Sequence, residues 1–173
     1  MPGHAWKQAG MDEFFLSLRL LLLLGVANST PIVVKRLLGT RWSVPLDAGW
    51  HFIDGQPLLG SSKTARGAIS AIICTTGAAL LLGFSLGLGA KVGAFAMLGD
   101  ILASFVKRRL SIAPSARAFG LDQIPEALLP LLMVQGIFSH PLLQIAGTTA
   151  AFFALEVPLS RLLFGLGVRD RPY

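Results

Sequence analysis

Long apolar segments separated by polar loops dominate the chain. Five such stretches are each near the ~20 residues that cross ~30 Å of hydrocarbon, and they run roughly over 14–34, 68–86, 91–106, 123–138 and 141–164. The third and fourth are short for a full crossing. No succession of roughly ten-residue segments alternates between apolar and polar positions, as the strands of a membrane barrel do. The pattern predicts an all-α polytopic membrane protein with about five transmembrane helices and two internal loops, formed by one domain over residues 1–173.

Composition agrees with a lipid-embedded protein and argues against an ordinary soluble one. Charged residues make up 14% of the chain, against roughly 25% in globular proteins. Hydrophobic residues make up 53%, and the mean hydropathy is +0.66. So much apolar surface on 173 residues cannot all be turned inward. The single cysteine, Cys74, excludes an internal disulfide framework and a cysteine-cluster metal site.

The net charge of +6 would suggest a nucleic-acid partner in a soluble protein, but the basic residues are placed as in a membrane protein. Twelve of the 15 follow the first or third apolar stretch or lie at the end of the fifth: Lys35, Arg36, Arg41, Lys63, Arg66, Lys107, Arg108, Arg109, Arg117, Arg161, Arg169 and Arg171. The positive-inside rule then places the N-terminus outside and both long loops and the C-terminus in the cytoplasm. The first stretch also has features of a cleaved signal peptide, but four further stretches must fold with it. We therefore expect a multi-pass protein of the cell membrane.

Asp100 is the most informative acidic residue, because apolar residues flank it on both sides. A carboxylate in a membrane helix costs at least ~2.5 kcal/mol on insertion scales, so it should face a polar cavity, a cation or a basic partner. Ser104, Lys107 and Arg108 lie at helical spacings that place them on the same face. A carboxylate below several bases suits a metal–phosphate site. The alternative is a helix-end aspartate paired with a lysine or arginine.

Asp122 precedes the fourth apolar stretch and has two interpretations. It can cap the helix that follows, as aspartate often does. It can also join Asp100 across a short loop, and two carboxylates from adjacent helices can hold one or two Mg²⁺ ions.

Two further segments are candidates for substrate binding. The segment from Gly60 to Gly67 combines a flexible Gly/Ser turn, Lys63, Arg66 and a helix start, which together attract an oligophosphate; its spacing does not fit a Walker loop. The alternative is a basic flank with a helix cap. Asn28, near Pro31 in the first stretch, indicates either a kink that faces a cavity or a helix-packing device.

Taken together, these segments resemble the CDP-archaeol synthase family, the short branch of the CTP:phosphatidate cytidylyltransferase superfamily. The similarity covers about residues 20–135 and rests on seven pieces in order: Asn28-Ser-Thr-Pro31, Leu46-Asp47-Ala-Gly49, Asp54-Gly55, Leu59-Gly60-x-x-Lys63-Thr64-x-Arg66-Gly67, Gly99-Asp100, Ser104-Phe-Val-Lys107-Arg108-Arg109 and Leu121-Asp122-Gln123.

The resemblance implies five membrane spans and transfer of CMP from CTP to a lipid phosphate at a cytoplasmic active site, with Mg²⁺ and room for a second cation. CTP, the lipid phosphate and the membrane are then the partners, nucleic acid is not, and a homodimer is left open. The candidate residues are Asp100, Asp122 and Lys107 for catalysis; Asn28, Asp54, Lys63, Arg66, Ser104 and Arg108 for substrate; and Asp100, Asp122 and Glu126 for metal.

The chain departs from the family pattern in two places. Ser61-Ser62 stands where archaeal members usually carry Asp-Gly, and Pro125 stands where they usually have an acid, with Glu126 one step later. A second metal site therefore depends on Glu126. The alternative function is that of a non-enzymatic relative that keeps the fold and binds nucleotide or anionic lipid.

Overall fold

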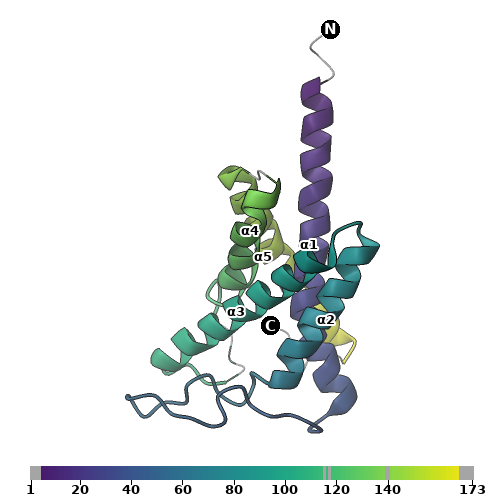
Figure 1. Cartoon of the computed structure of the whole chain (residues 1–173). Helices are drawn as coiled ribbons and strands as arrows, with labels where there is room; N and C mark the ends of the chain where they lie inside the picture. Colours follow the sequence, from purple (N-terminus) through teal and green to yellow (C-terminus); the bar gives the residue numbers. More distant parts are fainter. Residues whose placement is uncertain (1–4, 115, 117, 139–140, 168–173) are drawn as a thin grey trace.

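The computed structural model describes residues 5–114, 116, 118–138 and 141–167, and Figure 1 shows that these form a bundle of helices. No strand is present among them, and the helices are α1 (Ala5–Leu38), α2 (Ala65–Leu81), α3 (Leu86–Arg109), α4 (Gln123–Phe138) and α5 (Leu142–Gly165). The predicted all-α class is confirmed. Of the predicted cytoplasmic basic residues, Arg117, Arg169 and Arg171 lie outside the described residues.

Among the described residues, three helices contain segments long and apolar enough to cross a membrane: Met11–Leu38, Leu86–Arg109 and Leu142–Leu162. The other two, α2 and α4, are apolar but have only 17 and 16 residues. At 1.5 Å per residue, they reach roughly 25 Å and fall short of a full hydrocarbon layer. The five predicted segments are thus helical, but two of them are shorter than the expected spans.

The prediction was wrong about the turn between the second and third helices. We expected helices over 68–86 and 91–106, whereas α2 ends at Leu81 and α3 begins at Leu86. Gly83 adopts φ +79° and ends the first helix. The hydroxyl of Ser85 accepts a hydrogen bond from the backbone N–H of Leu88 at 3.3 Å and caps the second. The cap signal, not the apolar pattern, sets this boundary.

Small residues let α2 and α3 pack closely. A Cβ added at Gly89 would lie 2.5 Å from the Cβ of Ala79, and one added at Gly93 would lie 2.9 Å from the Cα of Ile72. Both distances are too short for real side chains, so these two glycines set the separation of the helices. Gly89 and Gly93 have the GxxxG spacing, and this spacing therefore has a packing role here.

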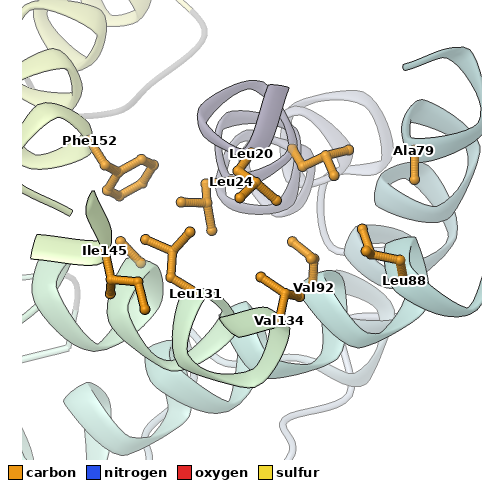
Figure 2. Packing of buried hydrophobic residues seen from close by; sticks show 11 residues of the cluster. Leu20, Leu24, Ala79, Leu88, Val92, Leu131, Val134, Ile145 and Phe152 are labelled. Carbon is orange, nitrogen blue, oxygen red and sulfur yellow. The ribbon is translucent and has the colours of Figure 1, made fainter. Parts of the chain in front are cut away.

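The hydrophobic core lies where the five helices meet, with α2 contributing Ala79, as Figure 2 shows. On α1 the buried positions Leu20, Leu23 and Leu24 recur at helical spacing. Their larger partners come from α3, α4 and α5: Leu88, Val92, Leu131, Val134, Ile145 and Phe152. This core holds the bundle together beside a polar region, which lies toward the end where α1 finishes and α2 begins.

Two loops complete that end of the molecule. The first, residues 39–64, is called the long loop below, and in Figure 1 it runs along the lower edge between the end of α1 and the start of α2. The hydroxyl of Thr64 accepts from the backbone N–H of Gly67 at 3.2 Å and caps α2. The second loop joins α3 to α4 over residues 110–122.

Candidate active site

A polar cavity of about 920 Å³ lies between the helices and both loops. All five helices contribute to its wall, together with the long loop and the 110–122 loop. Its charged lining residues are Lys35, Arg36, Lys63, Arg66, Asp100, Lys107, Asp122, Glu126 and Glu156. A volume of this size accommodates a nucleotide. Mixed charge of this density inside a membrane bundle indicates a functional site.

Lys63 and Asp100 form an ion pair within this lining. The Nζ atom of Lys63 donates to Oδ1 of Asp100 at 2.5 Å, and about a fifth of each side chain is exposed. Lys63 belongs to the long loop and directly precedes the cap of α2, whereas Asp100 lies in the middle of α3. Burial disfavours the ammonium, yet the negative charge of Asp100 raises the pKa of Lys63 above its ordinary value. The lysine is therefore held positively charged.

Glu126 faces Asp100 across the contact between α3 and α4. Their carboxyl groups are near enough to interact electrostatically. The cause is a close backbone approach one residue earlier on each helix, since a Cβ added at Gly99 would lie 2.3 Å from the backbone oxygen of Pro125. Glycine at 99 is thus what brings the two acids together. The departure at Pro125 leaves a carboxylate in the cavity, supplied by Glu126.

Lys107 and Asp122 form a second ion pair, between the end of α3 and the start of α4. The Nζ of Lys107 lies 2.7 Å from Oδ1 of Asp122 and also donates to the carbonyl of Ala116 at 3.1 Å. The other oxygen of Asp122 accepts from the backbone N–H of Ala118 at 3.1 Å. Both carboxylate oxygens are therefore engaged, one by Lys107 of α3 and the other by the backbone of the 110–122 loop. This arrangement differs from the expected pairing of Asp122 with Asp100 and from a cap on the first turn of α4.

Asp47 fixes the turn that presents Lys63. Its Oδ2 accepts from the backbone N–H groups of Leu59 at 2.9 Å and Gly60 at 2.8 Å, and its Oδ1 accepts from Gly49 at 3.1 Å. Burial alone would raise the pKa of this carboxyl, but the three N–H donors stabilise the anion and lower the pKa below its usual value. The backbone carbonyl of Lys63 in turn accepts from Leu46 at 2.8 Å. Asp47 is an anchor for this part of the loop.

Asn28 and Arg66 also line the cavity, in different ways. The Nδ2 atom of Asn28 is buried, and among the described residues it has no hydrogen-bond partner. An unpaired buried donor at a cavity wall suits a ligand acceptor. Arg66 instead donates to the backbone carbonyls of Gly39, at 3.1 Å, and Arg41. Its guanidinium thus fastens the end of α1 to the start of α2.

Three of the predicted substrate-binding residues do not line the cavity. Asp54 lies in the long loop, 3.2 Å from Nε of Arg109, and accepts from the backbone of Gln56. Ser104 and Arg108 are buried elsewhere on α3, with 2% and 3% of their surface exposed. The helical spacing placed them near the face of Asp100, but only Lys107 reaches the cavity.

Sequence reasoning missed two parts of the lining. Lys35 and Arg36 were expected only as a basic flank, and Glu156 of α5 was not singled out. The signal for Glu156 was available, because it is an acid within an apolar stretch, as Asp100 is. Its contribution depends on the packing of α5 against the rest of the bundle, which the sequence does not reveal.

Comparison with known proteins agrees with this geometry. The family model "CarS-like: CDP-archaeol synthase" matches residues 11–94 and 76–173. The CDP-archaeol synthase of Thermofilum pendens is 38% identical over 159 residues, which cover 86% of this chain and 76% of that protein. That of Sulfurisphaera tokodaii is 32% identical, over 86% of this chain and 89% of that protein.

A solved structure, described as an intramembrane enzyme for archaeal membrane lipids biosynthesis, shares the fold. It superposes with a TM-score of 0.69 at 30% sequence identity, over 82% of this chain and 90% of its own. The chain therefore belongs to the CDP-archaeol synthase family of CTP-dependent membrane lipid cytidylyltransferases.

Proposed function

We propose that the cavity is the active site in which this protein transfers CMP from CTP to a lipid phosphate. An oxygen of the lipid phosphate attacks the α-phosphorus of CTP, the bond to the β-phosphate oxygen breaks, and pyrophosphate leaves. The products are a CDP-activated lipid and pyrophosphate. The observation that carries the proposal is the cluster of Lys63, Asp100 and Glu126, drawn from three segments of the chain into one cavity.

The residues present fit a bound Mg²⁺ ion. Mg²⁺ takes oxygen ligands and is commonly held by one or two carboxylates together with substrate phosphates and water. Asp100 and Glu126 supply two facing carboxyl groups, which repel one another when both are charged unless a cation lies between them. Within the described part of the chain no group of three or more acidic, histidine or cysteine side chains is placed to hold a metal. We therefore assign one Mg²⁺ to Asp100, Glu126 and the nucleotide, where it would neutralise phosphate charge.

Asp122 has a different role in this proposal. Both of its oxygens are engaged, by Lys107 and by the backbone of Ala118. It therefore positions Lys107 rather than holding a second cation. Lys107 has only 6% of its surface exposed and points into the cavity lining. There it stabilises negative charge that develops on the phosphates as the new bond forms.

Lys63 and Asn28 complete the binding surface. The ammonium of Lys63 is held charged beside Asp100, and it would pair with a phosphate oxygen of the triphosphate. The buried amide of Asn28 gives a donor to a ligand oxygen. Such a reaction needs positioning and charge neutralisation more than a covalent nucleophile.

We assign the cavity to the cytoplasmic side. Lys35 and Arg36 end α1 and line the cavity, and Lys107–Arg109 end α3. Basic residues at one end of the spans favour that end facing the cytoplasm. Labelling of Ser61→Cys and Gly87→Cys in a Cys74→Ala background tests this in whole cells, because a Cβ at Gly87 meets nothing within 4 Å. An impermeant maleimide should label position 87 and leave position 61 unlabelled until the membrane is opened.

The experiment that tests the activity uses purified protein with CTP, Mg²⁺ and a lipid phosphate. Because the relatives are CDP-archaeol synthases, archaeol phosphate is the first substrate, and phosphatidic acid is the second. Release of pyrophosphate is expected, with loss of activity in Asp100→Asn and Glu126→Gln. Asp54→Asn is the matched control, because Asp54 lies outside the cavity, and it should stay active. Folded wild-type protein that binds CTP without turnover of either lipid would instead support the non-enzymatic alternative.

A further inference from the structure

The long loop exposes large apolar side chains that a loop in water would bury or lack. Trp42 has 76% of its surface exposed, Trp50 has 72% and Ile53 has 95%. All three lie outside the helices, so lipid contact along a membrane span does not account for them. Large apolar side chains left this exposed on one loop indicate an interaction surface.

The loop is fixed to the ends of three helices and does not project freely. At one side Arg66 of α2 binds the carbonyls of Gly39 and Arg41. At the other side Arg109, the last residue of α3, binds the carbonyl of Pro57 at 2.6 Å. The same guanidinium lies 4.6 Å from the centre of the Phe52 ring. The loop is therefore held flat across the ends of α1, α2 and α3, along the lower edge of Figure 1.

The part that presents Ile53 is a rigid hairpin turn. The backbone N–H of Leu58 donates to Trp50 at 2.8 Å, and that of Phe52 donates to Gln56 at 2.9 Å. At the tip, Oδ1 of Asp54 accepts from Gln56 at 3.0 Å. This geometry keeps the apolar tip exposed, since the turn cannot fold back on the bundle without breaking these bonds.

The ends of α1 and α3 mark the level of the membrane surface. Both helices contain candidate spans, and both finish in basic residues that suit lipid phosphates. Tryptophan is enriched at this depth, where its ring is half in the apolar layer and half among headgroups. We propose that the long loop lies in the headgroup layer of the same membrane, with Trp42, Trp50 and Ile53 inserted among the lipids.

This placement has a consequence for substrate entry, which rests on the proposed function. Ser43, Leu46 and Ser61 of the loop line the cavity. A loop in the headgroup layer opens the cavity at the height of the lipid phosphates. The lipid substrate then reaches the site sideways, with its chains still in the bilayer.

Tryptophan fluorescence tests the placement without any activity measurement. The chain has three tryptophans, so Trp6→Phe combined with Trp50→Phe leaves Trp42, and Trp6→Phe combined with Trp42→Phe leaves Trp50. Each full-length variant is reconstituted into phosphatidylcholine vesicles that contain some phosphatidylglycerol. The acyl chains carry bromine near the carbonyl end, near the methyl end, or not at all. Leu98→Trp in the tryptophan-free chain gives a reference inside the α3 span.

We expect both loop tryptophans to lose about half their fluorescence to bromine near the carbonyl end, because that bromine lies at the interfacial depth. They should lose much less to bromine near the methyl end and to aqueous iodide. The Leu98→Trp reference should show the opposite preference between the two lipids. Strong iodide quenching with no effect of either brominated lipid would overturn the proposal, whether or not the protein makes a CDP-lipid.

A second variant tests the apolar tip directly. Ile53→Asp should increase iodide quenching of Trp50 severalfold, whereas Ile53→Leu should leave it unchanged. The side chain makes no core contact to lose, given its 95% exposure, so the variant is expected to fold. Equal quenching in the two variants would contradict insertion of the tip.

Discussion

Substitution of Gly99 by alanine is the sharpest test of how the fold builds the site. The added Cβ would lie 2.3 Å from the oxygen of Pro125 and 2.7 Å from the nitrogen of Glu126, whereas ordinary contacts begin at 3.4 Å. Relief requires α3 and α4 to separate by roughly 1 Å, since backbone atoms in a packed interface cannot give way as a flexible side chain does. That shift moves Asp100 away from Glu126.

The expected effects follow from this displacement. A misplacement of about 1 Å costs on the order of 100-fold in kcat/KM, and overpacking lowers the free energy of unfolding by about 1–3 kcal/mol. CDP-lipid formation from labelled CTP measures the first, and thermal unfolding in detergent measures the second. The rate of CDP-lipid formation is divided by the fraction of protein that is folded at the assay temperature.

Gly136→Ala is the matched control, because Gly136 lies in α4 and a Cβ there meets nothing within 4 Å. It should keep full activity and gain about 0.5–1 kcal/mol of stability, as alanine does over glycine in a helix. Wild-type activity in folded Gly99→Ala protein would refute the claim that this close approach positions the two acids. Equal losses in both alanine variants would point to a general effect of helix stiffness instead.

Three further predictions concern the loop and the ion pairs. Asp47→Asn removes an anion that binds three backbone donors and should lower the free energy of unfolding by about 1.5 kcal/mol near neutral pH. The pKa of Asp47 in the folded protein lies below the unfolded value of about 3.9, so the wild-type loses this contribution as the pH falls through the folded pKa. The unfolding curves of the two proteins should therefore converge at low pH. Asn28→Leu should raise KM for a substrate at least several-fold with little change in unfolding temperature, since the amide has no partner among the described residues; an unchanged KM contradicts the assigned contact. Exchanging the charges of Lys63 and Asp100 should restore much of the stability lost in Lys63→Met but no activity, and an active exchanged variant would show that the pair is only structural.

The helices were largely predictable, and their ends were predictable where a cap was present. Apolar stretches located all five, but α3 begins at Leu86 because Ser85 caps it, five residues before the apolar pattern suggested. The apolar pattern did not extend the predicted helix into the glycine-rich segment before residue 91. The close contacts of Gly89 with α2 stabilise that segment as a helix, and such contacts depend on tertiary packing.

The sequence indicated which acidic and basic residues belong to the site, but it did not indicate which of them pair with one another. An acid inside an apolar stretch must find a cation or a polar cavity, and that argument located Asp100. Which lysine it meets depends on the path of the long loop, which Asp47 holds through bonds to Leu59 and Gly60. Spacing on one helix favoured Ser104 and Arg108, yet the partners come from other elements.

The ion pair of Lys63 with Asp100 shows that the structural and functional interpretations of a membrane-buried acid are compatible. Without ligand the loop lysine offsets the cost of placing a carboxylate in the bundle, as a paired aspartate at a helix end would. The same carboxylate also faces Glu126. A charged Asp100 attracts the ammonium of Lys63 but repels a charged Glu126. In the proposed function Asp100 and Glu126 would hold a cation, and the ammonium of Lys63 would then be available to a phosphate. On that proposal, the pair that stabilises the carboxylate in the bundle is also the pair that substrate binding would rearrange, so a single loop anchored by Asp47 would serve both the fold and the site.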